Sequence, residues 1–82
     1  MLIKYHSWIP SQLGVEEEML EVSSDITLNA VLDLLADKSP AHKRIFTQKN
    51  VIYGSRDGAV LEHNAILGPQ NTILLFSPIS GG

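Results

Sequence analysis

The chain has 82 residues, 44% of them hydrophobic, and a formal net charge of −3, which together indicate one ordinary globular domain. A domain of this size buries only about 60–65% of its unfolded surface, which leaves little room for a deep enzyme pocket. The absence of cysteine excludes a disulfide framework, a thiolate metal site and a cysteine nucleophile. The six Lys and Arg residues form no cluster, so we expect no nucleic-acid partner.

The sequence contains no targeting or membrane signal. Its opening, MLIKYHSWIP, lacks the basic and then apolar order of a signal peptide. No window approaches the roughly 18 apolar residues that a membrane-spanning helix needs. We therefore expect no membrane partner and a cytoplasmic location.

Two extended segments are expected at the start of the chain. Residues 2–9 alternate apolar and polar side chains, beginning with Ile3 and Lys4, which predicts a half-buried strand. Residues 10–14 contain a proline and a glycine and predict a break. Residues 15–22 are read as a second strand, and their run of three glutamates, 16–18, as a solvated stretch beside a hairpin turn.

Residues 23–40 contain the clearest helical pattern. Four apolar residues follow the i, i+3, i+4, i+7 spacing of one helix face: Leu28, Val31, Leu32 and Leu35. Thr27 or Asp25 can cap the free N–H groups at the start. Pro40 is expected to end the helix, and Lys38 to lie in its last turn, where positive charge suits the helix dipole.

The second half of the chain reads as short strands separated by turns. We expect first a short helical turn over 41–46, a strand over 51–53 and a turn over 54–58, in which Asp57 and Gly58 give the strongest signal. A strand over 59–61, a turn over 67–71 and a last strand over 72–76 are expected to follow. This order predicts an α+β fold with one main helix packed across a mixed sheet of four or five strands. The first and last strands are the most apolar and are expected side by side at its centre.

The last strand is apolar on both faces, because Ile73 and Leu75 point one way while Leu74 and Phe76 point the other. One interpretation is a short strand that is buried on both sides. The other is that Leu74 and Phe76 form a contact patch for a partner, with Trp8 beside them on the neighbouring strand.

The chain closes with two glycines. Pro78 removes a backbone donor and ends the strand, so we divide the chain into a domain, 1–77, and a flexible tail, 78–82. A glycine pair can pass through a channel too narrow for any Cβ, and its functional group is the terminal carboxylate of Gly82, for which we expect no processing. Such a tail is no catalyst alone but can carry a group; the alternative is a disordered chain end.

The ending FSPISGG, the length and the strand order resemble the small-subunit family of molybdopterin synthase, within the ubiquitin-like β-grasp sulfur carriers. The likeness extends to IKYHSWIPSQLG at the opening strand and TLNAVLDLL at the helix start. Where that family usually has a first proline after the phenylalanine, this chain has Ser77. The turn over 67–71 also differs from the family's usual one.

The resemblance implies a partner-dependent cycle. An adenylating enzyme of the ubiquitin-activating type would use ATP on Gly82, and a sulfur donor protein would then give a thiocarboxylate. The large subunit of molybdopterin synthase would receive the tail, in a heterotetramer, for molybdenum cofactor biosynthesis. Gly81 would provide clearance. The residues expected to anchor partners are Phe76, Ile79, Pro78, Trp8 and Leu74.

Other functions remain open. A sulfur carrier of the thiamine type and a ubiquitin-like modifier conjugated to lysines would use the same adenylated glycine, and a plain interaction domain would leave the glycines unused. We expect no bound cofactor. The three histidines, His6, His42 and His63, have no metal-ligand spacing, so we expect no metal site.

Overall fold

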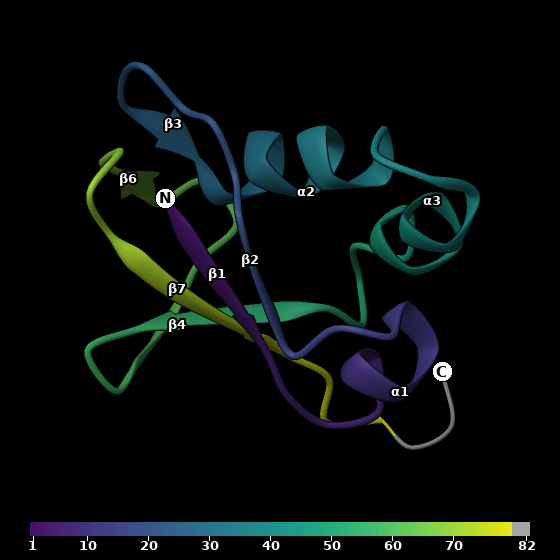
Figure 1. The fold of residues 1–82 in the computed structure, drawn as a ribbon. Coiled ribbons are helices and arrows are strands. Elements are labelled where there is room, and N and C mark those ends of the chain that lie inside the picture. The colour runs from purple at the N-terminus through teal and green to yellow at the C-terminus, as the bar shows by residue number, and fades with distance from the viewer. Residues whose placement is uncertain (80–82) are drawn as a thin grey trace.

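The computed structural model describes residues 1–79; the predictions for Gly81 and Gly82 lie outside this range. Its elements are β1 (Leu2–Tyr5), α1 (Ile9–Leu13), β2 (Glu17–Met19), β3 (Ile26–Thr27), α2 (Leu28–Ala36), α3 (Pro40–Phe46), β4 (Tyr53–Arg56), β5 (Ala59–Leu61), β6 (Ile66–Leu67) and β7 (Thr72–Phe76). Figure 1 shows the helices packed to one side of the strands. In the part of the chain that is described, no helix is long and apolar enough to cross a bilayer.

Five strands form a mixed sheet in the order β2-β1-β7-β4-β5, and β3 pairs with β6 in a separate ladder. At the centre β1 and β7 run parallel, with Ile3 opposite Ile73 and Tyr5 opposite Leu75. Both strands pair antiparallel with their other neighbours. A parallel pair needs a crossover, which the chain through α2 provides. The predicted α+β class and the central first and last strands are confirmed.

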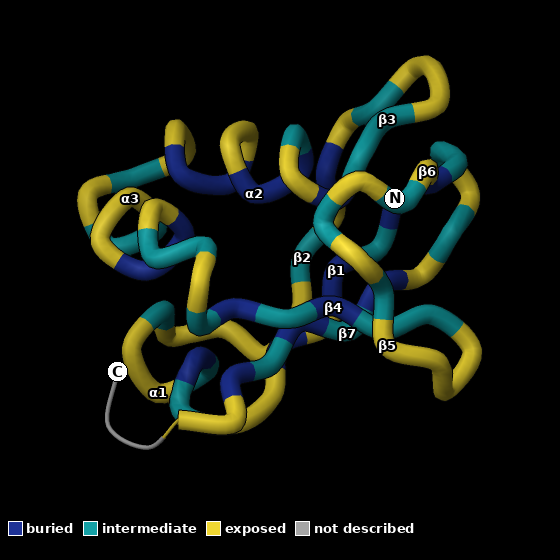
Figure 2. Tube along the Cα trace, turned by 180° about the vertical axis from the view of Figure 1, so that it is seen from behind, coloured by how far each residue is buried: buried dark blue, intermediate teal, exposed yellow. Residues whose placement is uncertain are grey.

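The predicted helix face forms the centre of the core. Leu28, Val31, Leu32 and Leu35 are completely buried, and Figure 2 shows α2 buried along the side that faces the sheet. The Thr27 hydroxyl accepts a 3.1 Å hydrogen bond from the Ala30 N–H, which confirms one of the two predicted caps. A Cβ at Gly54 would lie 3.1 Å from the Leu28 methyl groups, so α2 packs directly against the backbone of β4.

The turn predicted over 54–58 is confirmed only at Asp57 and Gly58, because residues 54–56 belong to β4, which runs over Tyr53–Arg56 and not over the predicted 51–53. The last strand is confirmed. Asp57 and Gly58 both have positive φ, at 53° and 82°, the geometry of a tight hairpin turn, and they join β4 to β5. The strands predicted over 59–61 and 72–76 have those bounds in the structure. The short helical turn expected over 41–46 is α3.

The first strand is shorter than predicted. It ends at Tyr5, and Ser7 takes a left-handed conformation with φ 61°, which turns the chain away from the sheet. The predicted break is the short helix α1, in which Pro10 is tolerated because the first N–H groups of a helix need no partner. Trp8 is therefore the N-cap of α1 and not a strand residue, so its expected place on the outer face of β1 was wrong.

The boundary after α2 was also misplaced. The helix ends at Ala36, and Pro40 begins α3 behind the Ser39 N-cap instead of ending α2. Lys38 lies between the two helices and does not sit in the last turn of α2. The strands β3 and β6 were not predicted, because two residues each are too few for a periodic signal.

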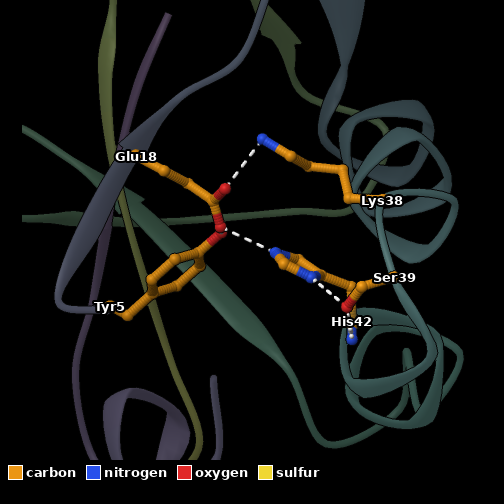
Figure 3. A network of polar contacts seen from close by, with 5 residues as sticks. All are labelled: Tyr5, Glu18, Lys38, Ser39 and His42. Carbon is orange, nitrogen blue, oxygen red and sulfur yellow. Dashed lines mark hydrogen bonds and ion pairs between the residues drawn. The ribbon is translucent and has the colours of Figure 1, made fainter. Parts of the chain in front are cut away.

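The expectation that all three glutamates of the run 16–18 are solvated was wrong for Glu18. Its side chain is only 17% exposed and faces the helices. The Tyr5 hydroxyl donates to it at 2.6 Å, and the Lys38 ammonium and the His42 Nε2 lie 2.7 and 2.8 Å from its two oxygens. The Ser39 hydroxyl lies 2.7 Å from the other ring nitrogen of His42. Figure 3 shows one carboxylate thus joining β1 and β2 to α3 and the segment before it.

These contacts shift two pKa values. Burial alone would raise the pKa of Glu18, but the hydrogen bonds from Lys38, Tyr5 and His42 outweigh it and lower that pKa to about 2. The pKa of Tyr5 is raised well above its usual range, first by burial and then by the hydrogen bond and the charge of Glu18.

A carboxyl whose folded-state pKa is lowered stabilises the fold above its unfolded pKa and loses that contribution as pH falls. We expect Glu18→Gln to lower the free energy of unfolding by about 1–3 kcal/mol at neutral pH. The gap to the wild type should close as pH falls from 4.5 toward 2, because the wild-type carboxyl then becomes protonated.

Urea unfolding of both chains across this pH range measures the gap. Glu17→Gln is the matched control, since Glu17 is exposed on the opposite face of β2. A gap between Glu18→Gln and the wild type that does not change with pH would contradict the assigned role of the carboxylate.

Candidate functional site

The candidate site lies where β7 ends and the chain leaves the sheet. Along β7, Ile73 and Leu75 are completely buried under the helices, while Leu74 and Phe76 are half-buried on the opposite face. The sheet thus turns an apolar outer face away from the helices at its central strand. The residues predicted as partner anchors lie on this face or just beyond it.

The aromatic neighbour of Phe76 is Tyr53, not Trp8. Tyr53 of β4 is the register partner of Phe76, and the two ring centroids are 6.0 Å apart with the planes inclined by 28°. His63 also packs against Tyr53, edge-on, with the ring centroids 6.3 Å apart. We call Tyr53, His63 and Phe76 the outer aromatic group. Only Phe76 was predicted, because the pairing of β4 with β7 cannot be read from local periodicity.

Leu74 continues this face toward the other end of β7. In the sheet register it lies between Lys4 of β1 and Ser55 of β4. Val60 of β5 lies opposite Ser55 and is 64% exposed. Directly paired residues place their side chains on the same face of a sheet. The outer face is therefore apolar at Leu74 and at Val60, with Ser55 between them and Lys4 on the other side of Leu74.

Beyond β7, residues 77–79 are held by the loop that follows β1. The His6 N–H donates to the Leu75 carbonyl at 2.9 Å, which extends the central pairing by one residue. The Ser77 N–H then donates to the Ser7 hydroxyl at 3.2 Å. The Trp8 indole N–H donates to the Ile79 carbonyl at 2.7 Å. We call Ser7, Trp8, Ser77 and Ile79 the tail clasp.

Local sequence explains the shape of the tail clasp. The left-handed turn at Ser7 directs its hydroxyl toward Ser77, and Trp8 is half-buried against the core as the N-cap of α1. Ser77 is buried, and its hydroxyl accepts from the Ile79 N–H at 3.3 Å. In Figures 1 and 2 the end of the described chain runs past α1. Sequence reasoning missed Ser7 and Ser77, whose partners are 70 residues away.

The structure places the predicted site residues in two groups. Phe76 and Leu74 lie on the outer face, while Trp8 and Ile79 meet in the tail clasp. Pro78 is exposed between them, and the Ile79 side chain is 53% exposed. That residues 78–82 form a separate tail stays a prediction. Within this segment, the Ile79 backbone is hydrogen-bonded to Trp8 and Ser77 of the domain.

Among residues 1–79, the buried polar side-chain atoms all have hydrogen-bond partners. His42 belongs to the Glu18 network, and the His63 Nε2 lies 3.1 Å from the Ile52 carbonyl. Within residues 1–79, no three His, Cys, Asp or Glu side chains gather in a way that could hold a metal ion. A pocket of about 300 Å³ is lined by Glu21, Val22 and Ser23 on the loop after β2, at the end of β1 opposite the tail.

The chain is similar to known proteins in its three-dimensional structure. No protein-family model matches the chain, and no curated protein sequence matches it. A crystal structure of small archaeal modifier protein 1 from Haloferax volcanii aligns over 100% of this chain and 98% of its own, at 25% identity and a TM-score of 0.78. A second crystal structure of that protein aligns over 96% and 97%, at 23% identity and a TM-score of 0.77.

A molybdopterin converting factor subunit 1 from Pyrococcus furiosus aligns over 95% of both chains, at 16% identity and a TM-score of 0.67. These structures share the order and packing of strands and helices with this chain over nearly its whole length. The chain therefore has the ubiquitin-like β-grasp fold, and it is similar over its whole length to small archaeal modifier protein 1.

Proposed function

We propose that the chain is a ubiquitin-like sulfur carrier whose Gly82 carboxylate is activated by adenylation and converted to a thiocarboxylate. One observation carries the proposal. The central strand of a β-grasp domain leads the chain out of the sheet at residues 77–79, and only Ser80 separates this segment from the Gly81–Gly82 pair of the sequence. The likeness to modifier and molybdopterin-converting structures supports it.

The chemistry needs only the terminal carboxylate from this chain. A carboxylate oxygen of Gly82 attacks the α-phosphorus of ATP, and pyrophosphate leaves. Sulfur at the oxidation level of sulfide, supplied by a donor protein, then attacks the carbonyl carbon and displaces AMP. The resulting thiocarboxylate is a softer and better nucleophile than the carboxylate. In this proposal the groups that catalyse both steps belong to the partner proteins, because this chain contributes only its terminal carboxylate.

The glycine pair suits a reaction inside another protein. Gly81 and Gly82 have no Cβ, so a narrow channel can admit their backbone. Any larger side chain would need a wider channel that also admits water. In this proposal Gly82 carries the reacting carbon and Gly81 provides the clearance, while the folded body remains outside the channel.

We further propose that the receiving partner is the large subunit of a molybdopterin synthase. The likeness to a molybdopterin converting factor subunit and the ending FSPISGG support this pathway. The tail would enter the large subunit and give its sulfur to a pterin precursor, with two small subunits on a large-subunit dimer. The outer face would dock through Phe76 and Leu74, with Tyr53 beside Phe76, and Pro78 and Ile79 would line the entrance.

A second candidate is a protein modifier joined to lysine side chains. The likeness to small archaeal modifier protein 1, at 25% identity over the whole chain, favours it. The adenylate would be the same, but an amine would attack it in place of sulfur. Conjugates that react with an antibody to the chain, and that disappear when acceptor lysines are replaced, would identify a modifier. A free chain that gains sulfur would identify a carrier.

The proposal predicts that deletion of Gly82 abolishes adenylation. The shortened chain ends about 3.5 Å earlier, and a misplacement of even ~1 Å can cost about a hundredfold in rate. ATP–pyrophosphate exchange with the cognate activating enzyme should therefore fall by at least a hundredfold, while the unfolding temperature stays unchanged. Ser80→Ala, which keeps the chain length and the carboxylate, is the matched control. Exchange that persists without Gly82 would refute the role of this residue.

The proposal also predicts that Phe76→Ala weakens partner binding. An aromatic side chain at the centre of an interface contributes more than ~1 kcal/mol, which is about fivefold in Kd. Titration calorimetry with the large subunit measures the change. Leu34→Ala is the control, because Leu34 is an exposed apolar residue on α2, on the far side of the sheet from Phe76. Equal Kd values for the two variants would remove Phe76 from the interface.

A further inference from the structure

The tail clasp attaches the last described residue to the start of the chain. Trp8 and Ile79 are separated by 71 residues in sequence, and the indole N–H meets the Ile79 carbonyl at 2.7 Å, a short distance for such a bond. The Trp8 ring is half-buried against the core, and its own carbonyl accepts a hydrogen bond from the Ser11 hydroxyl at 2.8 Å. The donor therefore has a fixed place on the folded body.

Ser77 supports the same contact from the other side. Its N–H is bonded to the Ser7 hydroxyl, and its own hydroxyl contacts both the N–H and the carbonyl of Ile79, at 3.3 and 3.4 Å. These bonds bend the chain at Pro78 so that the Ile79 carbonyl faces Trp8. Two independent sets of contacts, one from Trp8 and one through Ser77, hold the Ile79 backbone.

The tail clasp sets how far the terminal carboxylate can extend. With Ile79 held, the three residues that follow it can span at most about 10 Å when fully extended. With the clasp open, the five residues after Ser77 could span at most about 17 Å. When the tail clasp is formed, the terminal carboxylate can therefore lie only within the shorter distance of a fixed Ile79. When the clasp is open, the carboxylate can reach farther, but Ile79 no longer has a fixed position.

The tail clasp holds the backbone of Ile79 but leaves its side chain accessible to a partner. The contact uses the backbone carbonyl of Ile79, while the side chain of Ile79 remains 53% exposed. A contact that inhibited the tail would be expected to bury the apolar side chain that a partner grips. The geometry instead leaves that side chain accessible, with its backbone already ordered.

We propose that Trp8 is a positioning residue, which holds Ile79 so that the last three residues leave the domain from a fixed point and enter the activating enzyme at a reduced entropic cost. This role rests on the proposed function, since it concerns the same carboxylate. It differs from the anchor role predicted for Trp8, because the indole acts on the chain's own tail. One hydrogen bond of ordinary net strength corresponds to an effect of about 2- to 10-fold.

The first experiment tests the clasp without any enzyme. The chain has one tryptophan, so its indole N–H gives a single proton signal in NMR spectra. In the full chain we expect this proton to exchange slowly with solvent. A chain that ends at Pro78 lacks the acceptor and should give a freely exchanging indole, whereas a control chain that ends at Ile79 keeps an acceptor oxygen. Identical exchange in all three chains would overturn the proposal.

The second experiment measures adenylation of the full-length chain. Trp8→Phe keeps an aromatic ring but removes the N–H, and it should raise the KM of the activating enzyme for the chain by about 2- to 10-fold, with a smaller change in kcat. Ser77→Ala keeps Trp8 and should raise KM in the same direction. Thr47→Val is the matched control, because it removes a comparable side-chain bond to the Lys43 carbonyl on α3.

The possible outcomes separate the two proposals. An unchanged or lowered KM in Trp8→Phe, with unfolding temperature intact, would overturn the positioning role while leaving the carrier function. A wild-type chain that no activating enzyme adenylates would overturn the carrier function, and the positioning role with it, even if NMR shows the clasp. A raised KM in Trp8→Phe and Ser77→Ala but not in Thr47→Val would support the positioning role.

Discussion

The parallel pairing of the first and last strands is the constraint on which the rest of the structure depends. Because β1 and β7 run side by side in the same direction, both end at the same edge of the sheet. The loop after β1 therefore lies beside the segment after β7. This is why Ser7 and Trp8 can hold residues 77–79, and why the chain leaves the domain from its centre instead of from an exposed edge strand.

The partly buried polar network around Glu18 stabilises the fold. Glu18 draws donors from β1, the α2–α3 connection and α3 to one carboxylate, which secures the short edge strand β2. A partly buried carboxylate is stable there only because each oxygen has partners. In the proposed function, the chemistry would belong to the Gly82 carboxylate and to the partner proteins.

Local patterns predicted the elements whose signals are local. The spacing of Leu28 and Val31 located the buried face of α2, and the Asp57–Gly58 pair located a hairpin whose two φ angles are positive. The same reasoning extended the first strand through Ile9, because alternation cannot show a left-handed turn at Ser7. It also placed Glu18 in solvent, since its partners lie 13 to 24 residues away in sequence. Contacts that depend on topology could not be read from periodicity.

The central claim is that Gly82 carries sulfur. Intact-mass spectrometry of the chain, after incubation with its activating enzyme, ATP and a sulfide source, tests it most directly. The account predicts an ATP-dependent gain of about 16 Da, the difference between sulfur and oxygen, confined to the C-terminal peptide. A mass that stays unchanged under these conditions, or a gain of sulfur elsewhere in the chain, would contradict the account.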